Sequence, residues 1–135
     1  MKEFENKVAV ITGGTHGIGK CIAEEFRKNG ASVCVIDKAE GDHFIGDISD
    51  KAVLEAFNDS VIKEHGHIDF LINNALPLMK GINECSYEEF QYALSVGVTA
   101  PFYLSKLFIP HFNPGGSIIN ISSSHDRMSQ PQTET

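Results

Sequence analysis

Thr12-Gly13-Gly14-Thr15-His16-Gly17-Ile18-Gly19 is the stretch of sequence that decides the fold of this chain. It follows an apolar run, Val8–Ile11, that predicts a buried strand. It leads into Lys20–Lys28, where apolar residues recur at the spacing of an amphipathic helix. Glycine permits backbone angles that a side chain would block, and N–H groups at a helix start carry the positive end of the helix dipole. The stretch therefore predicts a binding site for a diphosphate.

The glycines follow the spacing T-G-x-x-x-G-x-G, which differs from the more common G-x-G-x-x-G. This spacing resembles the glycine-rich turn of the short-chain dehydrogenase/reductase (SDR) family. Taken alone, the turn also fits a tight strand-to-helix connection that binds nothing. The resemblance implies that the turn contacts a dinucleotide cofactor through Gly13, Thr15, His16, Gly17, Ile18 and Gly19.

A second buried strand, Val33–Ile36, is closed by Asp37, eighteen residues beyond Gly19. A carboxylate at this place can accept hydrogen bonds from both hydroxyls of an adenosine ribose, and it would repel a 2′-phosphate. Asp37 therefore favours NAD over NADP, although it would also serve as a solvated charge at a strand end. Lys38 is a neighbouring cation that could tolerate a phosphate, which weakens the preference.

A short third strand, His43–Gly46, is separated from the second by Lys38–Asp42 alone. Five residues are too few for the usual crossover helix between parallel strands. We therefore expect an extended arm here, and a cofactor adenine that is more open to water on this side. Asp47 and Ile48 match the Asp-apolar pair that lies beside the adenine in the SDR family, while Asp47 or Ser49 would equally cap the next helix.

Residues 50–65 predict a helix ended by Gly66, and Ile68–Ile72 predict a further buried strand. His65 and His67 form an H-x-H pair without a suitably spaced acidic or thiol partner, so we expect no metal site.

The strand Ile68–Ile72 ends in Asn73-Asn74-Ala75-Leu76, which resembles the N-N-A-G motif of the SDR family with leucine in place of glycine. By this resemblance Asn74 and Ala75 line the cofactor; the alternative for the two asparagines is turn formation alone.

A long helix is expected from Ser86, where Ser86 and Glu89 form a plausible capping box. Pro101 should kink it. Around the kink, Ser95–Phe102 resembles an SDR segment in which Val96 lies beside the cofactor and an asparagine holds a water of the proton relay. Gly97 stands at the asparagine position, so it can interrupt the helix but has no side chain to hold the water.

Residues 113–116 predict a turn and Ser117–Ile121 a last strand. The pattern G-G-S-I-I-N-I-S-S resembles the SDR strand that carries the substrate-orienting serine, which implies a catalytic role for Ser123 and a cofactor contact for Ile121. Turn-forming polarity is the alternative for the serine triplet. The family also needs a Y-x-x-x-K motif beyond this serine; the twelve residues after Ser123 contain none, so we expect the chain as given to be inactive alone.

Alternating strands and helices predict an α/β fold with a Rossmann-like doubly wound parallel sheet, in one domain over residues 1–135. We expect about five strands and three main helices, which would be an incomplete version of the SDR fold. The net charge of −7 argues against nucleic-acid partners. The sequence contains no run of about eighteen apolar residues, so we expect no membrane-spanning segment. The three cysteines are widely spaced and the start lacks an apolar signal region, so we expect reduced thiols in a cytoplasmic protein.

Two functions are compatible with these patterns. The first is an NAD(H)-dependent SDR oxidoreductase that interconverts a small alcohol and a carbonyl by hydride transfer. The resemblance further implies a homo-oligomer, a dimer or tetramer, through the long helix; Leu104, Leu107 and Phe108 fit either that interface or the core. The second is a truncated, catalytically silent dinucleotide-binding module that acts as a sensor or assembly partner.

Overall fold

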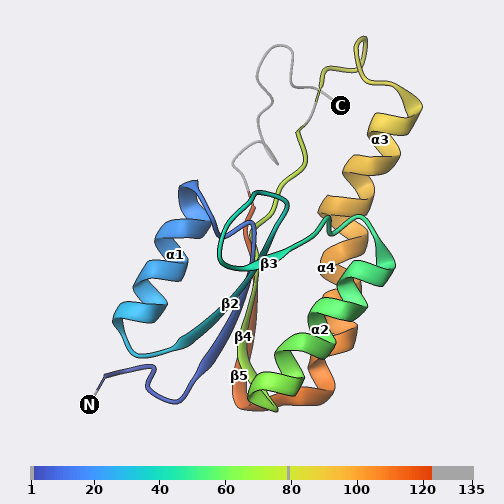
Figure 1. Ribbon diagram of the computed structural model, residues 1–135. Coiled ribbons are helices and arrows are strands. Elements are labelled where there is room, and N and C mark those ends of the chain that lie inside the picture. The colour runs from blue at the N-terminus through green and yellow to red at the C-terminus, as the bar shows by residue number, and fades with distance from the viewer. Residues whose placement is uncertain (1, 79, 123–135) are drawn as a thin grey trace.

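The structure, a computed structural model, describes residues 2–78 and 80–122. It contains one parallel sheet of five strands in the order β3-β2-β1-β4-β5 (Figure 1). The strands are β1 (Val8–Thr12), β2 (Ser32–Asp37), β3 (Phe44–Ile45), β4 (Ile68–Asn73) and β5 (Phe112–Asn120). The chain runs outward from β1 to β3 and then returns to the other side of β1. This reversal confirms the predicted Rossmann-like fold, and such folds bind ligands at the carboxyl ends of the strands flanking it.

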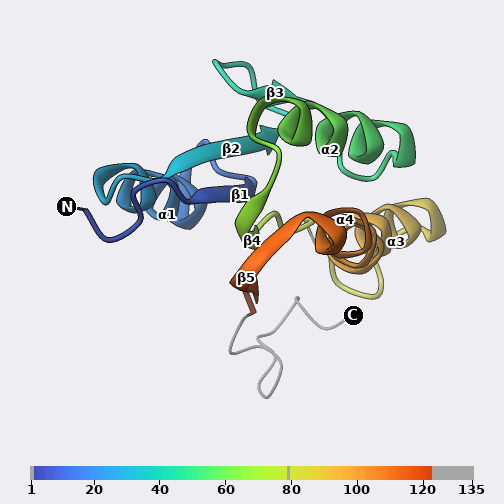
Figure 2. The same cartoon turned by 90° about the horizontal axis from the view of Figure 1, so that it is seen from below.

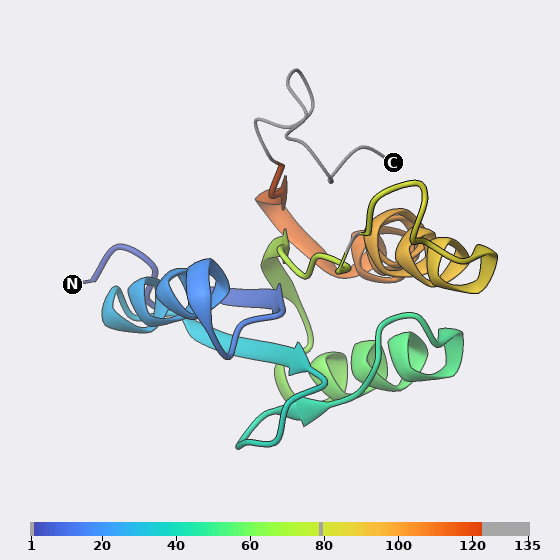
Figure 3. The same cartoon turned by 90° about the horizontal axis from the view of Figure 1, so that it is seen from above.

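Helices cover both faces of the sheet (Figures 2 and 3). On one face lies α1 (Gly17–Lys28), and on the other lie α2 (Lys51–His65) and the pair α3 (Tyr87–Leu94) and α4 (Ala100–Phe108). The side chains of β1 alternate between the two faces of the sheet. Val8 and Val10 pack with α2 and α4, whereas Ala9 and Ile11 pack with α1. All four are at most 3% exposed, as expected for a central parallel strand.

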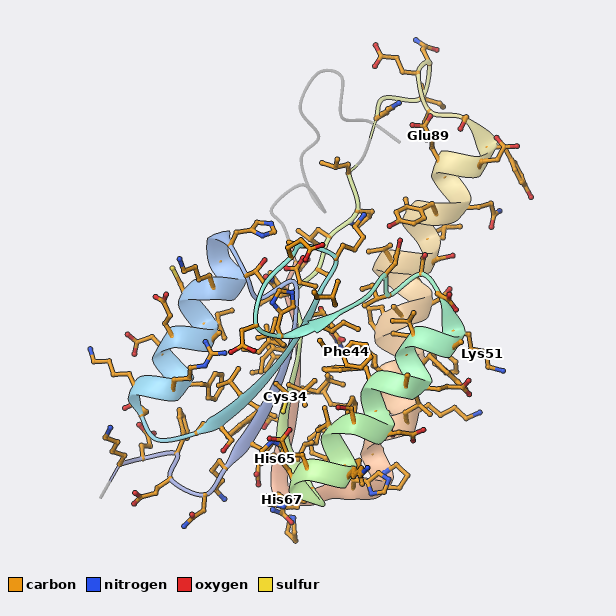
Figure 4. All side chains as sticks on the ribbon, viewed as in Figure 1. Cys34, Phe44, Lys51, His65, His67 and Glu89 are labelled. Carbon is orange, nitrogen blue, oxygen red and sulfur yellow. The ribbon has the colours of Figure 1, made fainter. Side chains whose placement is uncertain are left out.

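The connection from β2 to β3 contains no helix, as its length predicts. It is a series of bends rather than the straight arm we expected, and the His43 imidazole lies 2.7 Å from the Ala39 carbonyl oxygen across it. Phe44 then points from β3 toward α2, and the centroids of the Phe44 and Phe57 rings are 5.3 Å apart (Figure 4). The following helix is capped by Asp50, which accepts a hydrogen bond from the Ala52 N–H, so the expectation that Asp47 or Ser49 caps it is wrong.

The long helix begins at the predicted capping box of Ser86 and Glu89. Its interruption is a π-helical turn, Ser95–Thr99, where the Ala100 N–H donates to the Ser95 carbonyl. In a regular α-helix the Pro101 ring would clash with the Gly97 carbonyl, and the wider turn relieves this clash. Tyr87–His111 is long and apolar enough by composition to cross a membrane, but helices packed on a protein core meet the same criterion. Here the helical stretch buries Val96, Ala100, Leu104 and Phe108 against the sheet layer.

The last strand differs most from the prediction. Residues 113–116 are not a turn before the strand; they lie inside β5, which runs from Phe112. The register moves from Ile68 opposite Phe112 to Phe70 opposite Ser117, so the extra residues form a bulge. Gly115, with φ of +87°, supplies the left-handed backbone that the bulge needs. Because Gly and Pro are typical of both turns and bulges, the sequence pattern alone favoured the commoner turn.

Candidate functional site

The glycine-rich turn joins β1 to α1 at the carboxyl end of the sheet. Gly13 and Gly17 have φ of +66° and +58°, in the left-handed region that glycine tolerates best. A Cβ at Gly17 would meet no described atom within 4 Å, so the backbone there faces open space. A Cβ at Gly19 would instead collide with the Gly13 carbonyl and the Asn74 amide. The predicted glycines therefore have two distinct roles, one open to a ligand and one internal.

The amino terminus of α1 has no internal cap among the described residues. His16 is the N-cap residue, but its side chain makes no capping hydrogen bond, and the first turn contains no acidic residue. The His16 side chain is 80% exposed, and Ile18 is also exposed. The N–H groups of the first helical turn are thus available to an external acceptor, and the helix dipole favours an anionic one. This arrangement, together with the open space at Gly17, fits the diphosphate of a dinucleotide.

Asp37 lies at the end of β2, facing this turn. Its Oδ2 accepts from the Thr15 hydroxyl at 2.7 Å and the Thr15 N–H at 3.4 Å, and its Oδ1 accepts from the Ala39 N–H at 3.0 Å. The His16 Nδ1 is 3.9 Å from the same Oδ2. Burial opposes the charge of Asp37, but these hydrogen bonds and His16 outweigh burial and lower the pKa of the carboxyl. Asp37 is thus held as an oriented carboxylate beside the glycine-rich turn.

Tyr92, a residue that no sequence pattern indicated, links Asp47 to Lys38. The Tyr92 hydroxyl, on α3, donates to Asp47 Oδ2 at 2.8 Å and accepts from Lys38 Nζ at 3.0 Å. Asp47 Oδ1 accepts from the Ser49 N–H at 2.9 Å. Burial opposes the charge of Asp47, but the Ser49 and Tyr92 hydrogen bonds and the Lys38 charge lower its pKa. The hydrogen bond to Tyr92 is the main cause of a raised pKa at Lys38, and the two nearby carboxylates add to it.

The turn after β4 is fixed to the glycine-rich turn by Thr12. The buried Thr12 hydroxyl accepts from the Asn74 N–H at 3.0 Å and the Ala75 N–H at 2.9 Å. The Asn74 side-chain amide donates to the carbonyls of Gly13, at 2.9 Å, and Thr12, at 3.2 Å. Asn74 and Ala75 therefore lie against the glycine-rich turn, as the prediction of a common site requires. Leu76, which follows, is 65% exposed.

Other predicted site residues lie deeper or outside the described region. Ile48 and Val96 are only 7% and 6% exposed, and their side chains belong to the core between the sheet, α2 and α4. Ile121 follows β5, and its N–H donates to the Asn73 carbonyl at 3.0 Å. Ser123, the predicted catalytic residue, lies outside the described residues.

His65 and His67 lie at the opposite end of the sheet (Figure 4). The His67 Nδ1 is 3.1 Å from the His65 carbonyl oxygen, and its Nε2 is 3.4 Å from the carboxylate of Asp69. Within residues 2–78 and 80–122, no three His, Cys, Asp or Glu side chains are grouped in a way that would hold a metal ion. The three cysteines are free thiols, and burial raises the pKa of Cys34 to about 11.

Comparison with known proteins identifies the class. The family model "short chain dehydrogenase" matches residues 7–135, so the chain belongs to the short-chain dehydrogenase family. It is 34% identical to L-fucose dehydrogenase of Mus musculus, over all of this chain and 55% of that protein. The chain thus spans about half the length of the curated relatives it matches.

Solved structures agree with this assignment. An apo SCOR enzyme from Clostridium thermocellum matches with a TM-score of 0.89 and 38% identity, over 95% of this chain and 58% of that one. A metagenomic short-chain oxidoreductase in complex with NADP matches with a TM-score of 0.80 and 28% identity, over 89% and 62% of the two chains. The fold therefore agrees with membership of the short-chain dehydrogenase family, and one of these matched structures is a complex with NADP.

Proposed function

We propose that this chain forms the cofactor-binding part of an NAD(H)-dependent oxidoreductase that interconverts a small alcohol and a carbonyl. NAD(H) supplies hydride transfer when bound. The chain's residues hold it: the N–H groups at the start of α1 and the open backbone at Gly17 take the diphosphate. Asp47, which follows β3, and Asn74 and Ala75, which follow β4, flank the nucleoside, while Ile48 supports Asp47 from the core. Val96 packs in the core below this edge of the sheet, Ile121 follows β5 at the same edge, and Ser123 orients the substrate.

The observation that carries the preference for NAD(H) is the geometry of Asp37. Thr15 and Ala39 fix both of its oxygens beside the glycine-rich turn, and Oδ1, which accepts only from the Ala39 N–H, keeps a lone pair for a ribose hydroxyl. A carboxylate oriented in this way accepts a hydrogen bond from a ribose hydroxyl and repels a 2′-phosphate. Its lowered pKa keeps it charged at neutral pH. The bends of residues 38–43 leave no helix over this side, so we also propose that the adenine is partly open to water.

Titration of the protein with NADH and NADPH, followed by nicotinamide fluorescence, tests this proposal. We expect NADH to bind at least about tenfold more tightly, since one charge-assisted hydrogen bond is worth roughly 1.5–3 kcal/mol. Asp37→Asn should reduce this ratio, because the amide keeps the Thr15 contact but loses the charge. Asp42→Asn, an equal charge change at an exposed site, is the matched control. Equal affinities for the two cofactors in the unmodified protein would refute the role of Asp37.

We further propose that the intact protein is a homo-oligomer through an exposed apolar stripe on the long helix. Leu104 and Phe108, which fitted either role, are fully buried and belong to the core. The stripe consists instead of exposed residues at a spacing of four: Phe90, Leu94, Val98 and Phe102. Light scattering should report a larger species than the monomer, and Phe102→Glu should dissociate it. A monomer at micromolar concentration would refute this assembly.

A further inference from the structure

Tyr92 links two loops that are far apart in the sequence. It lies on α3, while Lys38 follows β2 and Asp47 follows β3. Its hydroxyl donates its one proton to Asp47 and uses a lone pair to accept from the Lys38 ammonium. The ammonium also lies 5.3 Å from the centroid of the Tyr92 ring, within the range of a cation–π contact. The three side chains form one polarised row: ammonium, hydroxyl, carboxylate.

The contacts in this row determine which carboxylate the Lys38 ammonium lies beside. Lys38 directly follows Asp37 in the chain, so a free Lys38 side chain would reach the same ribose end of the site. Lysine carries a compact charge on a flexible stem, and its position depends on the contacts that hold the ammonium. Here the contacts are with Tyr92, and through it with Asp47, whose other oxygen is fixed by Ser49. The ammonium is thereby directed to the Asp47 side.

A 2′-phosphate beside Asp37 needs a cation to offset the repulsion between two anions. His16 and Lys38 are the basic side chains near this carboxylate in the described structure, and Lys38 is the one that carries an ammonium group. We propose that Tyr92 is a specificity-determining residue that holds Lys38 on Asp47 and thereby denies a 2′-phosphate its nearest permanent cation. The inference rests on the proposed binding of a nicotinamide dinucleotide by this edge of the sheet.

Fluorescence titrations of NADH and NADPH to Tyr92→Phe test it. The phenylalanine keeps the ring but removes the acceptor that holds the ammonium. We expect the affinity for NADPH, relative to NADH, to rise about two- to fivefold, the size expected for a new contact of an exposed ammonium with phosphate. Tyr92→Leu also removes the ring contact and should give at least the same gain. Tyr87→Phe is the matched control, because Tyr87 is on the same helix, is 75% exposed, and its hydroxyl makes no hydrogen bond to any described residue.

The double variant Tyr92→Phe/Lys38→Met identifies the source of the gain. If freed Lys38 supplies it, the double variant returns to the original ratio or below. An unchanged ratio in both Tyr92 variants, or a gain that persists without Lys38, would overturn the inference. If the unmodified protein binds neither cofactor, it is the proposed function that fails. Thermal unfolding of each variant without cofactor verifies that the titrations compare folded proteins.

Discussion

Alanine substitutions at Gly19 and Gly17 should affect different properties of the protein, the first mainly its stability and the second mainly its binding of NADH. A methyl group at Gly19 would overlap the Gly13 carbonyl and the Asn74 amide, which are themselves hydrogen-bonded to each other at 2.9 Å. Neither group is the free end of a flexible side chain. Relief therefore requires the glycine-rich turn to move away from the β4 turn, and both Asn74 hydrogen bonds to the turn carbonyls are strained or lost.

The magnitude follows from these two effects. Overpacking a close contact costs roughly 1–3 kcal/mol, and each lost hydrogen bond roughly 0.5–1.5 kcal/mol, so we expect Gly19→Ala to lower the free energy of unfolding by about 3 kcal/mol. At Gly17 the methyl group enters open space, and the cost is the left-handed backbone, with φ of +58°. That conformation costs an L-residue about 1 kcal/mol. Gly17→Ala should therefore be the milder change for stability.

Urea unfolding followed by far-UV circular dichroism measures both costs, and a titration with NADH adds the binding comparison. Gly17→Ala should weaken NADH binding about tenfold or more while unfolding near the original midpoint, since the methyl group occupies the space proposed for the diphosphate. Gly17→Val should abolish binding. If Gly17→Ala destabilises the fold as much as Gly19→Ala does, or leaves NADH affinity unchanged, the division of roles between the two glycines is wrong.

Three further changes test other parts of the structure. Thr12→Val keeps the shape of the buried side chain but leaves two backbone N–H groups without their acceptor, and should lower the free energy of unfolding in urea by about 2–4 kcal/mol; a loss below about 0.5 kcal/mol would contradict this bonding. Asp37 and Asp47 have lowered pKa values, so the stability they contribute is present above the ordinary carboxyl pKa of about 4 and is lost as the pH falls through their folded values. The urea midpoint should therefore drop on acidification below about pH 4, and less steeply in Asp37→Asn. Iodoacetamide at pH 8 should modify the exposed Cys21 well before Cys34, whose pKa is raised to about 11, as mass spectrometry of the peptides would show.

Local patterns predicted most of the elements because their causes are local. The apolar run of β1, the capping box at Ser86 and the left-handed Gly66 at the end of α2 are each determined by a few neighbouring residues. The absent crossover helix also followed from a local quantity, the five or six residues available between the second and third strands. The positions of Asp37 and Asn74 at one edge then followed from topology, since parallel strands place their carboxyl ends together.

The contacts that complete the site could not be read from the sequence in the same way. Tyr92 reaches Lys38 and Asp47 across separations of 54 and 45 residues, and no periodicity encodes such a meeting. Thr12 was visible only as the first residue of the turn, although its hydroxyl fixes the β4 turn 62 residues away. Such contacts depend on how helices and loops pack over the finished sheet, which is decided by tertiary structure.

The position of the bulge in β5 explains how an irregular strand still places its carboxyl end at the candidate site. A one-residue slip in pairing would turn every side chain of the strand to the opposite face, so any extra residues must be absorbed before the functional end. The bulge lies at the amino end of β5, where a Cβ on Gly116 would come within 2.8 Å of the Asp69 carbonyl. Beyond it the register is regular, from Phe70 opposite Ser117 to Asn73 opposite Asn120, and the side-chain amides of the last pair bond at 2.8 Å. The bulge at residues 113–116 therefore precedes the regular pairing that brings the carboxyl end of β5 beside that of β4, where the Ile121 N–H donates to the Asn73 carbonyl.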